Sequence, residues 1–201
     1  MKNVITIQHA QSIQHTNGMM GSWTDWELTK LGKEQAENLG RNLSAELKGQ
    51  AYKIYSSDLI RARQTAEPLA RYMGVEVEYR EGLREINYGD AIGKSKQWAQ
   101  ENRLPINSID EPEFLGAETW RELWNRVESA YCGIIASKAE NVILVSHGGA
   151  LAVWHQGLID FNVRDPKFGP AGGVSFLHEN FDGKRIVSRL NDLSYIGTNP
   201  D

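Results

Sequence analysis

The chain has 201 residues, of which 40% are hydrophobic and 24% are charged. This composition excludes a disordered chain, a collagen-like repeat and a disulfide-rich scaffold. The 22 basic and 26 acidic side chains give a net charge of −4, which provides no electrostatic footprint for nucleic acid. The length fits a single domain over residues 1–201, and the one cysteine, Cys132, excludes an intrachain disulfide.

The two most apolar segments are not typical of a targeting signal or a membrane span. Residues 4–7 are too few for the apolar core of a signal peptide before the polar Gln8. Residues 142–159 form the longest apolar stretch, but they include the polar His147 and His155. We therefore expect a cytoplasmic protein whose partner is a small molecule rather than a membrane or a nucleic acid.

Strand and helix patterns alternate along the chain. Short β-branched or apolar runs between turn residues predict strands, and apolar residues spaced by three or four predict helices. The predicted strands cover residues 2–7, 52–55, 75–79, 142–145, 173–178 and 185–190. The predicted helices cover residues 29–47, a segment from a cap at Ser57 or Asp58 to Gly74, a short segment around Trp98, and residues 119–137 and 148–158. This order indicates an α/β fold with a largely parallel sheet, whose last two strands form a hairpin at Asp182-Gly183.

Two of the predicted helices have a clear apolar side. The residues expected on the inner side of helix 29–47 are Leu31, Ala36, Leu39, Leu43 and Leu47. Those of helix 119–137 are Trp120, Trp124, Val127, Tyr131 and Ile134. Helices of this kind pack one face on a sheet and leave the other in water.

Polar residues follow three predicted strands at their carboxyl ends. They are His9 after the first strand, Ser56-Ser57 after the second and Ser146-His147 after the strand at 142–145. Ligands of open α/β sheets bind beyond the carboxyl ends of the strands, so we expect these side chains on one rim. Gly148 and Gly149 would let a ligand approach the backbone there, and a helix N-terminus favours an anion.

Each chemical candidate has a more ordinary explanation when it is taken alone. His9 and Arg61 are equally typical of surface residues, Glu85 of a solvated loop carboxylate, and His147 of a tight strand–helix turn. Together, two imidazoles, a guanidinium and a carboxylate suit phosphoryl transfer. A histidine can be the nucleophile, the cationic and imidazole groups can stabilise the phosphoryl group, and the acid can protonate the leaving alkoxide. This chemistry needs no metal and no cofactor.

Five segments of the chain carry a further signal. They are Thr6-Ile7-Gln8-His9-Ala10-Gln11-Ser12, Leu28-Thr29 with Gly32, Gln35 and Ala36, residues 56–66, residues 83–89, and Val145-Ser146-His147-Gly148-Gly149. In this order over nearly the whole chain, they resemble the histidine phosphatase superfamily, in the branch of phosphoglycerate mutase and related small phosphatases. The resemblance implies a three-layer α/β sandwich with helices on both faces of a mostly parallel sheet.

The resemblance also implies a role for each candidate. His9 would be the phosphorylated nucleophile and Glu85 the proton donor. Arg61 and His147 would bind the phosphoryl group, with the amide of Gly148 beside them.

Three positions depart from the family pattern. The family has arginine where this chain has Gln8, glycine where it has Ala10, and asparagine where it has His15. Glutamine donates hydrogen bonds but carries no charge, so the phosphate pocket is weakened. We hypothesise that a protonated His15 returns part of this charge, which places both Gln8 and His15 among the phosphate-binding residues.

These observations favour a metal-independent phosphomonoesterase that acts on a small phosphorylated metabolite through a phosphohistidine. One alternative is a catalytically weak phospho-ligand-binding or regulatory protein on the same fold. A phosphoglycerate-type mutase is less favoured, because mutases of this family carry longer insertions around the site. Residues 95–119 are expected to cap the pocket, and Trp23 and Trp26 to form an apolar wall. The sequence indicates neither the particular ester nor the oligomeric state.

Overall fold

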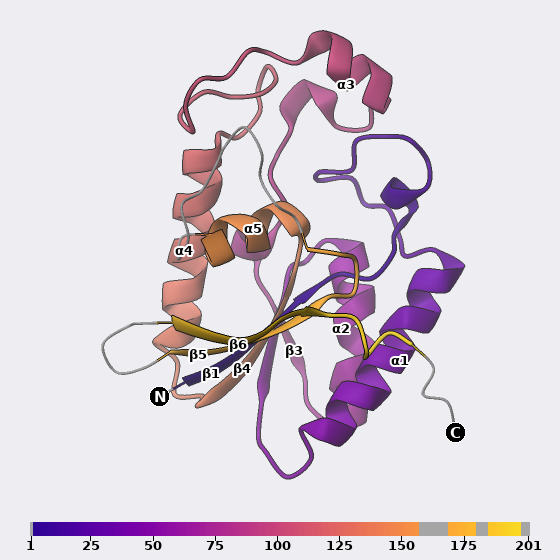
Figure 1. Ribbon diagram of the computed structural model, residues 1–201, viewed down its shortest axis with the longest axis vertical. Helices are drawn as coiled ribbons and strands as arrows, with labels where there is room; N and C mark the ends of the chain where they lie inside the picture. The colour runs from indigo at the N-terminus through magenta and orange to yellow at the C-terminus, as the bar shows by residue number, and fades with distance from the viewer. Residues whose placement is uncertain (1, 157–168, 180–184, 198–201) are drawn as a thin grey trace.

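The structure is a computed structural model that describes residues 2–156, 169–179 and 185–197. Its described strands form one six-stranded sheet in the order β3-β2-β4-β1-β5-β6 (Figure 1). The strands are β1 (Lys2–Gln8), β2 (Lys53–Ser56), β3 (Val77–Tyr79), β4 (Asn141–Ser146), β5 (Val174–Glu179) and β6 (Arg185–Asp192). The first four run parallel, and β5 and β6 add an antiparallel hairpin at one edge. The predicted sheet is confirmed, while the turn Asp182-Gly183 lies outside the described residues.

The helices cover both faces of the sheet. They are α1 (Lys30–Glu46), α2 (Ile60–Met73), α3 (Lys96–Asn102), α4 (Trp120–Ile135) and α5 (Gly148–Gln156), with short 3-10 turns at Ile13–His15, Glu81–Leu83 and Gly89–Ala91. Helices α1 and α2 pack on one face, and α4 and α5 on the other, which confirms the three-layer sandwich (Figure 1). Within the described ranges, no helix is long and apolar enough to cross a membrane. The predicted end of α5 at Leu158 falls outside those ranges.

Alternating side chains of the central strands build two separate cores. Ile5 and Ile143 point into the core under α1 and α2, whereas Val4 and Leu144 point into the core under α4 and α5. Because β1 and β4 are covered on both faces, they are continuous apolar runs rather than half-polar ones. This burial fixes the register of the strands whose ends carry the candidate site.

The helix ends follow from local chemistry, with one exception. Thr29 caps α1 by accepting a hydrogen bond from the amide of Gly32, and Thr119 and Glu122 form a capping box at the start of α4. Gly74 ends α2 in the left-handed conformation, with φ of 67°. The prediction of a Ser57 or Asp58 cap on α2 is wrong, because Leu59 takes the cap position without a side-chain hydrogen bond.

Two details of the helix faces also differ from the prediction. Leu31 is 49% exposed, so it does not belong to the inner side of α1. On α4, Leu123 is fully buried although it is not among the predicted inner residues, while Trp124 is only half-buried. In each helix the predicted buried side is correct. Which residues at the margin of that side are buried depends on how the neighbouring elements pack rather than on the sequence period.

Helices α1 and α2 cross in close contact at Gly40. A Cβ atom there would lie 2.8 Å from the backbone nitrogen of Leu69 and 2.9 Å from the carbonyl carbon of Pro68. Since both atoms belong to the backbone of α2, neither can move aside as a flexible side chain would. The glycine therefore permits the helix separation at this crossing.

We predict opposite effects of alanine at two helical glycines. Gly40→Ala should lower the free energy of unfolding by about 1–3 kcal/mol, because it forces α1 and α2 apart. Gly133→Ala on α4 should raise it by about 0.5–1 kcal/mol, because a Cβ atom there meets nothing within 4 Å and alanine is the better helix former. Urea titration of both variants measures the difference. A stable Gly40→Ala protein would contradict the tight crossing.

Candidate active site

The carboxyl ends of three parallel strands place the candidate residues on one rim. Gln8 at the end of β1 pairs in register with Ser146 at the end of β4, and β2 ends at Ser56 beside them. His9, the first residue after β1, donates its backbone N–H to the carbonyl of Ser146 at 3.0 Å. His147 follows directly, which confirms that the two histidines meet at this rim.

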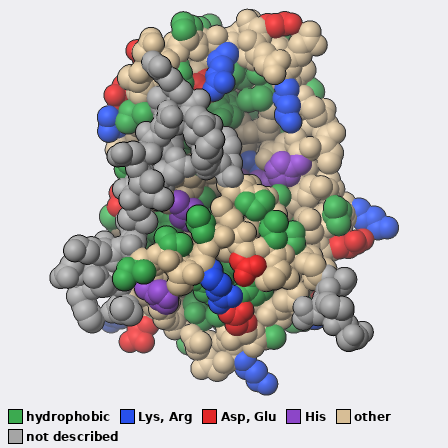
Figure 2. Space-filling view, viewed as in Figure 1, with side chains coloured by type: hydrophobic (Ala, Val, Ile, Leu, Met, Phe, Trp, Pro, Cys, Tyr) green, Lys and Arg blue, Asp and Glu red, His purple; other side chains and the backbone are tan. Residues whose placement is uncertain are grey.

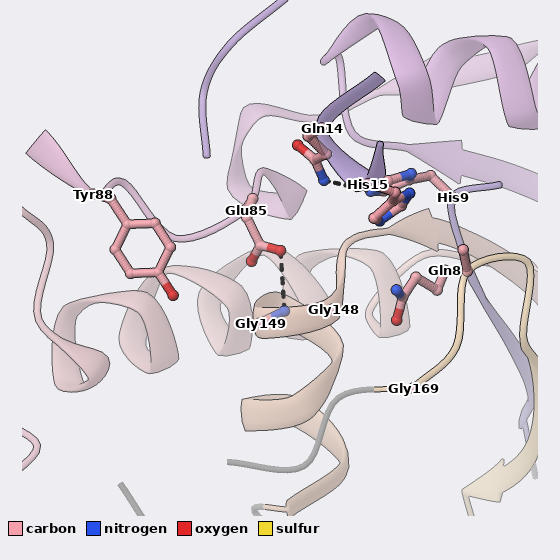
Figure 3. A pocket seen from close by; sticks show the side chains of 10 residues that line it. Gln8, His9, Gln14, His15, Glu85, Tyr88, Gly148, Gly149 and Gly169 are labelled. Atoms are coloured by element: carbon pink, nitrogen blue, oxygen red, sulfur yellow. Dashed lines mark hydrogen bonds between the residues drawn. The ribbon is translucent and has the colours of Figure 1, made fainter. Parts of the chain in front are cut away.

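A cavity of about 380 Å³ opens at this rim, on the hollowed face that Figure 2 shows. Its described lining residues are Gln8, His9, Gln14, His15, Glu85, Tyr88, Gly148, Gly149, Gly169 and Ala171 (Figure 3). Six of the residues singled out in the sequence are therefore in the wall: Gln8, His9, His15, Glu85, Gly148 and Gly149. Arg61 and His147 are fully buried behind His9.

The hydrogen bonds of His9 assign its tautomer. Its Nδ1–H donates to the carbonyl of Ala10 at 2.8 Å, and its Nε2 accepts from Nε–H of Arg61 at 3.2 Å. The carboxamide nitrogen of Gln14 lies 3.5 Å from the same Nε2. Burial, followed by the nearby Arg61 and His15, holds the pKa of His9 well below its usual range. The imidazole is thus neutral at pH 7, and the lone pair of Nε2 accepts the hydrogen bond from Arg61.

Arg61 is a buried cation whose side chain is held by two backbone carbonyls as well as by His9. It leaves the first turn of α2, and its Nη1 and Nη2 donate to the carbonyls of Thr24 at 3.0 Å and Ser22 at 2.6 Å. Burial lowers the pKa of Arg61 to about 10, although the negative charges of Glu85 and Asp25 raise it in part. The guanidinium therefore remains charged at neutral pH, directly behind His9.

His147 has one ring nitrogen in a hydrogen bond and one without a partner. Its Nε2 lies 2.8 Å from the hydroxyl of Ser57, while its buried Nδ1 has no partner among the described groups. The His9 and His147 rings are 5.1 Å apart. Burial, together with Arg61, His9 and Arg126, lowers the pKa of His147 well below its usual range. A buried nitrogen left in this state is suited to hydrogen-bond a ligand.

The side chain of Glu85 comes from the loop after β3 and reaches the N-terminus of α5, across the cavity from His9 (Figure 3). Its carboxylate accepts backbone N–H bonds from Gly149 at 3.1 Å and Ala150 at 3.2 Å, and from Ile86 at 2.9 Å. A Cβ atom at position 149 would lie 2.4 Å from Glu85 Oε1, so a glycine is needed for this approach. The helix end and the loop after β3 thus fix the carboxyl group within the wall.

Gln8 and His15 flank the nucleophile, as the resemblance implies. Gln8 is only 7% exposed, and its Oε1 is buried without a hydrogen-bond partner. The ring of His15 stacks on His9 at 5.3 Å, and its Nδ1 accepts the backbone N–H of Ser12 at 3.0 Å. Burial, then Arg61 and Lys96, lowers the pKa of His15. His15 is therefore neutral at pH 7 and adds no charge.

The sequence did not single out Gln14 or Tyr88, although both line the cavity. Their positions in loops beside His9 and Glu85 were the available signal, but loop conformation cannot be derived from spacing. The expected apolar wall of Trp23 and Trp26 is not found, since neither residue lines the cavity. Trp23 instead donates its indole N–H to the backbone carbonyl of Glu85 at 2.6 Å.

The chain matches the family model of the histidine phosphatase superfamily (branch 1) over residues 4–192, and it belongs to that superfamily. A protein of Hydrogenobacter thermophilus named "Putative phosphoserine phosphatase 2" is 31% identical over 157 residues, which cover 75% of each chain. The 2,3-bisphosphoglycerate-dependent phosphoglycerate mutase of Methylocella silvestris is 30% identical over 161 residues, covering 74% of this chain and 77% of the relative.

The fold agrees with solved structures of the superfamily. A mycobacterial glucosyl-3-phosphoglycerate phosphatase superposes with a TM-score of 0.80 at 22% identity, covering 95% of this chain and 99% of that one. The family and the relatives together indicate a phosphatase or mutase activity.

The lowered pKa of His15 restricts any charge compensation for Gln8 to acidic pH. Since a histidine is charged only below its pKa, phosphate affinity of the wild type should exceed that of His15→Asn only below about pH 6.5. Gln8→Arg should tighten phosphate binding by about tenfold at every pH, through a charge-assisted hydrogen bond. Calorimetric titration with inorganic phosphate between pH 5.5 and 8 measures the affinity of each variant relative to that of the wild type. A pH-independent ratio for His15→Asn would reject the compensation hypothesis.

Proposed function

We propose that the protein is a phosphomonoesterase that hydrolyses a small cytoplasmic phosphate ester through a phosphohistidine at His9. The observation that carries this proposal is the tautomer of His9, whose Nε2 lone pair faces a buried guanidinium. Glu85 provides a carboxyl group on the opposite wall of the same cavity. The arrangement supports the proposal because a group that can act as nucleophile, a positive charge and a group that can act as acid surround one cavity.

In the first step, His9 Nε2 attacks phosphorus and the ester P–O bond breaks. The Arg61 Nε–H, released from Nε2, hydrogen-bonds a phosphoryl oxygen instead, and the unpartnered His147 Nδ1 and the Gly148 amide are further donors for that group. A protonated Glu85 gives its proton to the leaving alkoxide. In the second step, water attacks the phosphohistidine, Glu85 accepts the proton of the water, and the N–P bond breaks to release phosphate.

This mechanism uses only side chains and backbone amides of the chain. Among the described residues, no group of three or more His, Cys, Asp or Glu is placed to hold a metal ion. Hydrolysis is also supported by the phosphatase name of the Hydrogenobacter relative. Transfer to a second hydroxyl, as the name of the Methylocella mutase describes, would use the same first step and differ only in the acceptor.

A second candidate function is binding or sensing of a phosphorylated ligand without efficient turnover. It is favoured by Gln8, which replaces the expected cation beside the nucleophile and leaves a buried oxygen without a partner. With Arg61 as the cation in contact with His9, the phosphoryl group is neutralised less completely than by two guanidinium groups. Turnover measurements distinguish this candidate from the esterase.

The phosphoenzyme provides the direct test of the esterase. Rapid quenching during turnover should trap an acid-labile, base-stable phosphoryl label on the wild type and none on His9→Ala. Release of inorganic phosphate should continue in excess chelator and without an added acceptor alcohol. Turnover by His9→Ala would overturn the mechanism, whereas loss of activity in chelator that a divalent ion restores would show a metal-dependent reaction.

The acid role of Glu85 predicts a dependence on the leaving group. An alkoxide needs a proton as it leaves, while nitrophenolate needs it much less. Glu85→Gln should therefore lower kcat for alkyl phosphates by roughly 100-fold or more, with a much smaller loss for nitrophenyl phosphate. Equal losses on the two substrates would assign the proton to another group.

A further inference from the structure

We propose that residues 22–24 are a positioning element that holds the phosphoryl-binding Arg61 and the acid Glu85 in one fixed arrangement. The inference rests on the proposed function, because it assigns to Glu85 the role of proton donor. It concerns residues that do not line the cavity and that would act through the side chains that do. Ser22 and Thr24 contact Arg61, and Trp23 between them contacts the backbone of Glu85.

Trp23 provides the contact with the acid. Its indole N–H donates to the backbone carbonyl of Glu85 at 2.6 Å. The same carbonyl accepts Nη2–H of Arg126 from α4 at 3.1 Å. The guanidinium groups of Arg84 and Arg126 lie over the indole ring, at 4.8 Å and 5.9 Å from its centroid. The peptide that carries the Glu85 side chain is thus held by two donors from elements distant in sequence.

Ser22 connects to the same loop beyond the acid. Its hydroxyl donates to the carbonyl of Ile86 at 2.6 Å and accepts the N–H of Tyr88 at 2.9 Å. Ser22 is 4% exposed and has a φ of 49°, a conformation that non-glycine residues rarely adopt. Such backbone strain persists only where the surrounding structure enforces it, and it is concentrated at functional sites.

The opposite side of this element holds Arg61. The carbonyls of Ser22 and Thr24 accept Nη2–H and Nη1–H of the guanidinium, at 2.6 Å and 3.0 Å. The left-handed conformation of Ser22 allows its carbonyl to face Arg61 while its hydroxyl faces the acid loop. A displacement of this residue would therefore move both the cation behind the nucleophile and the carboxyl group across the cavity.

Trp23→Phe removes one hydrogen-bond donor and retains an aromatic ring between the two arginines. It should lower kcat/KM for an alkyl phosphate by about three- to tenfold and leave nitrophenyl phosphate within about twofold. In the Glu85→Gln background, Trp23→Phe should cause no further loss. The matched control is Trp26→Phe in the same loop, which should leave both substrates unchanged.

Ser22→Gly tests the coupling, because glycine adopts the same φ without strain while the hydroxyl is lost. It should change the ratio of kcat/KM for the alkyl phosphate to kcat/KM for nitrophenyl phosphate. It should also weaken the binding of inorganic phosphate, measured by calorimetry, by about two- to fivefold. Thermal unfolding of each variant confirms that the fold is retained.

Equal losses on both substrates for Trp23→Phe, or the same loss in the Glu85→Gln background, would overturn the positioning role. A Ser22→Gly protein that changes only one of its two readouts would overturn the coupling. If Glu85→Gln itself shows no leaving-group dependence, the proposed acid fails first, which separates failure of the function from failure of this inference.

Discussion

The buried guanidinium of Arg61 is the constraint around which the site is arranged. A cation without water must find a partner for its donors, since an unpaired charge in the interior costs several kcal/mol. Here the partners are one imidazole nitrogen and two backbone carbonyls. The loop after β1 therefore has to curve over the start of α2, and this curvature brings the nucleophile, the cation and the acid loop together.

The same charge adds to the effect of burial on the protonation of the imidazoles around it. Arg61 contributes to lowering the pKa of His9, His15 and His147, although burial is the larger cause in each case. A cluster of three histidines is often a pH switch, but this one is held neutral across the physiological range. Neutral imidazoles are what the proposed nucleophilic mechanism requires, and they leave Arg61 as the cation of this cluster.

The architecture and the chemical residues could be predicted from the sequence because both depend on short-range patterns. Strand runs, the helical spacing of apolar residues, and polar residues at strand ends are local signals, and they placed His9 and His147 on one rim. The contacts of Trp23 could not be predicted, because they depend on a long loop crossing to a carbonyl distant in the chain. Gln14 and the exposure of Leu31 were missed for the same reason: each is decided by tertiary packing.

The central position of β1 determines at which stage of folding the candidate site is completed. The strand that carries the nucleophile lies between β4 and β5, and the Gly172 amide hydrogen-bonds the carbonyls of Gln8 and His9. Both neighbours of this strand come much later in the chain than β1 itself. Long-range pairing of this kind is slow and exposes unpaired edges until it is complete. The rim around His9 is therefore completed only when β4 and β5 have paired with β1, and a fragment that ends before β4 lacks both the strand beside β1 and His147.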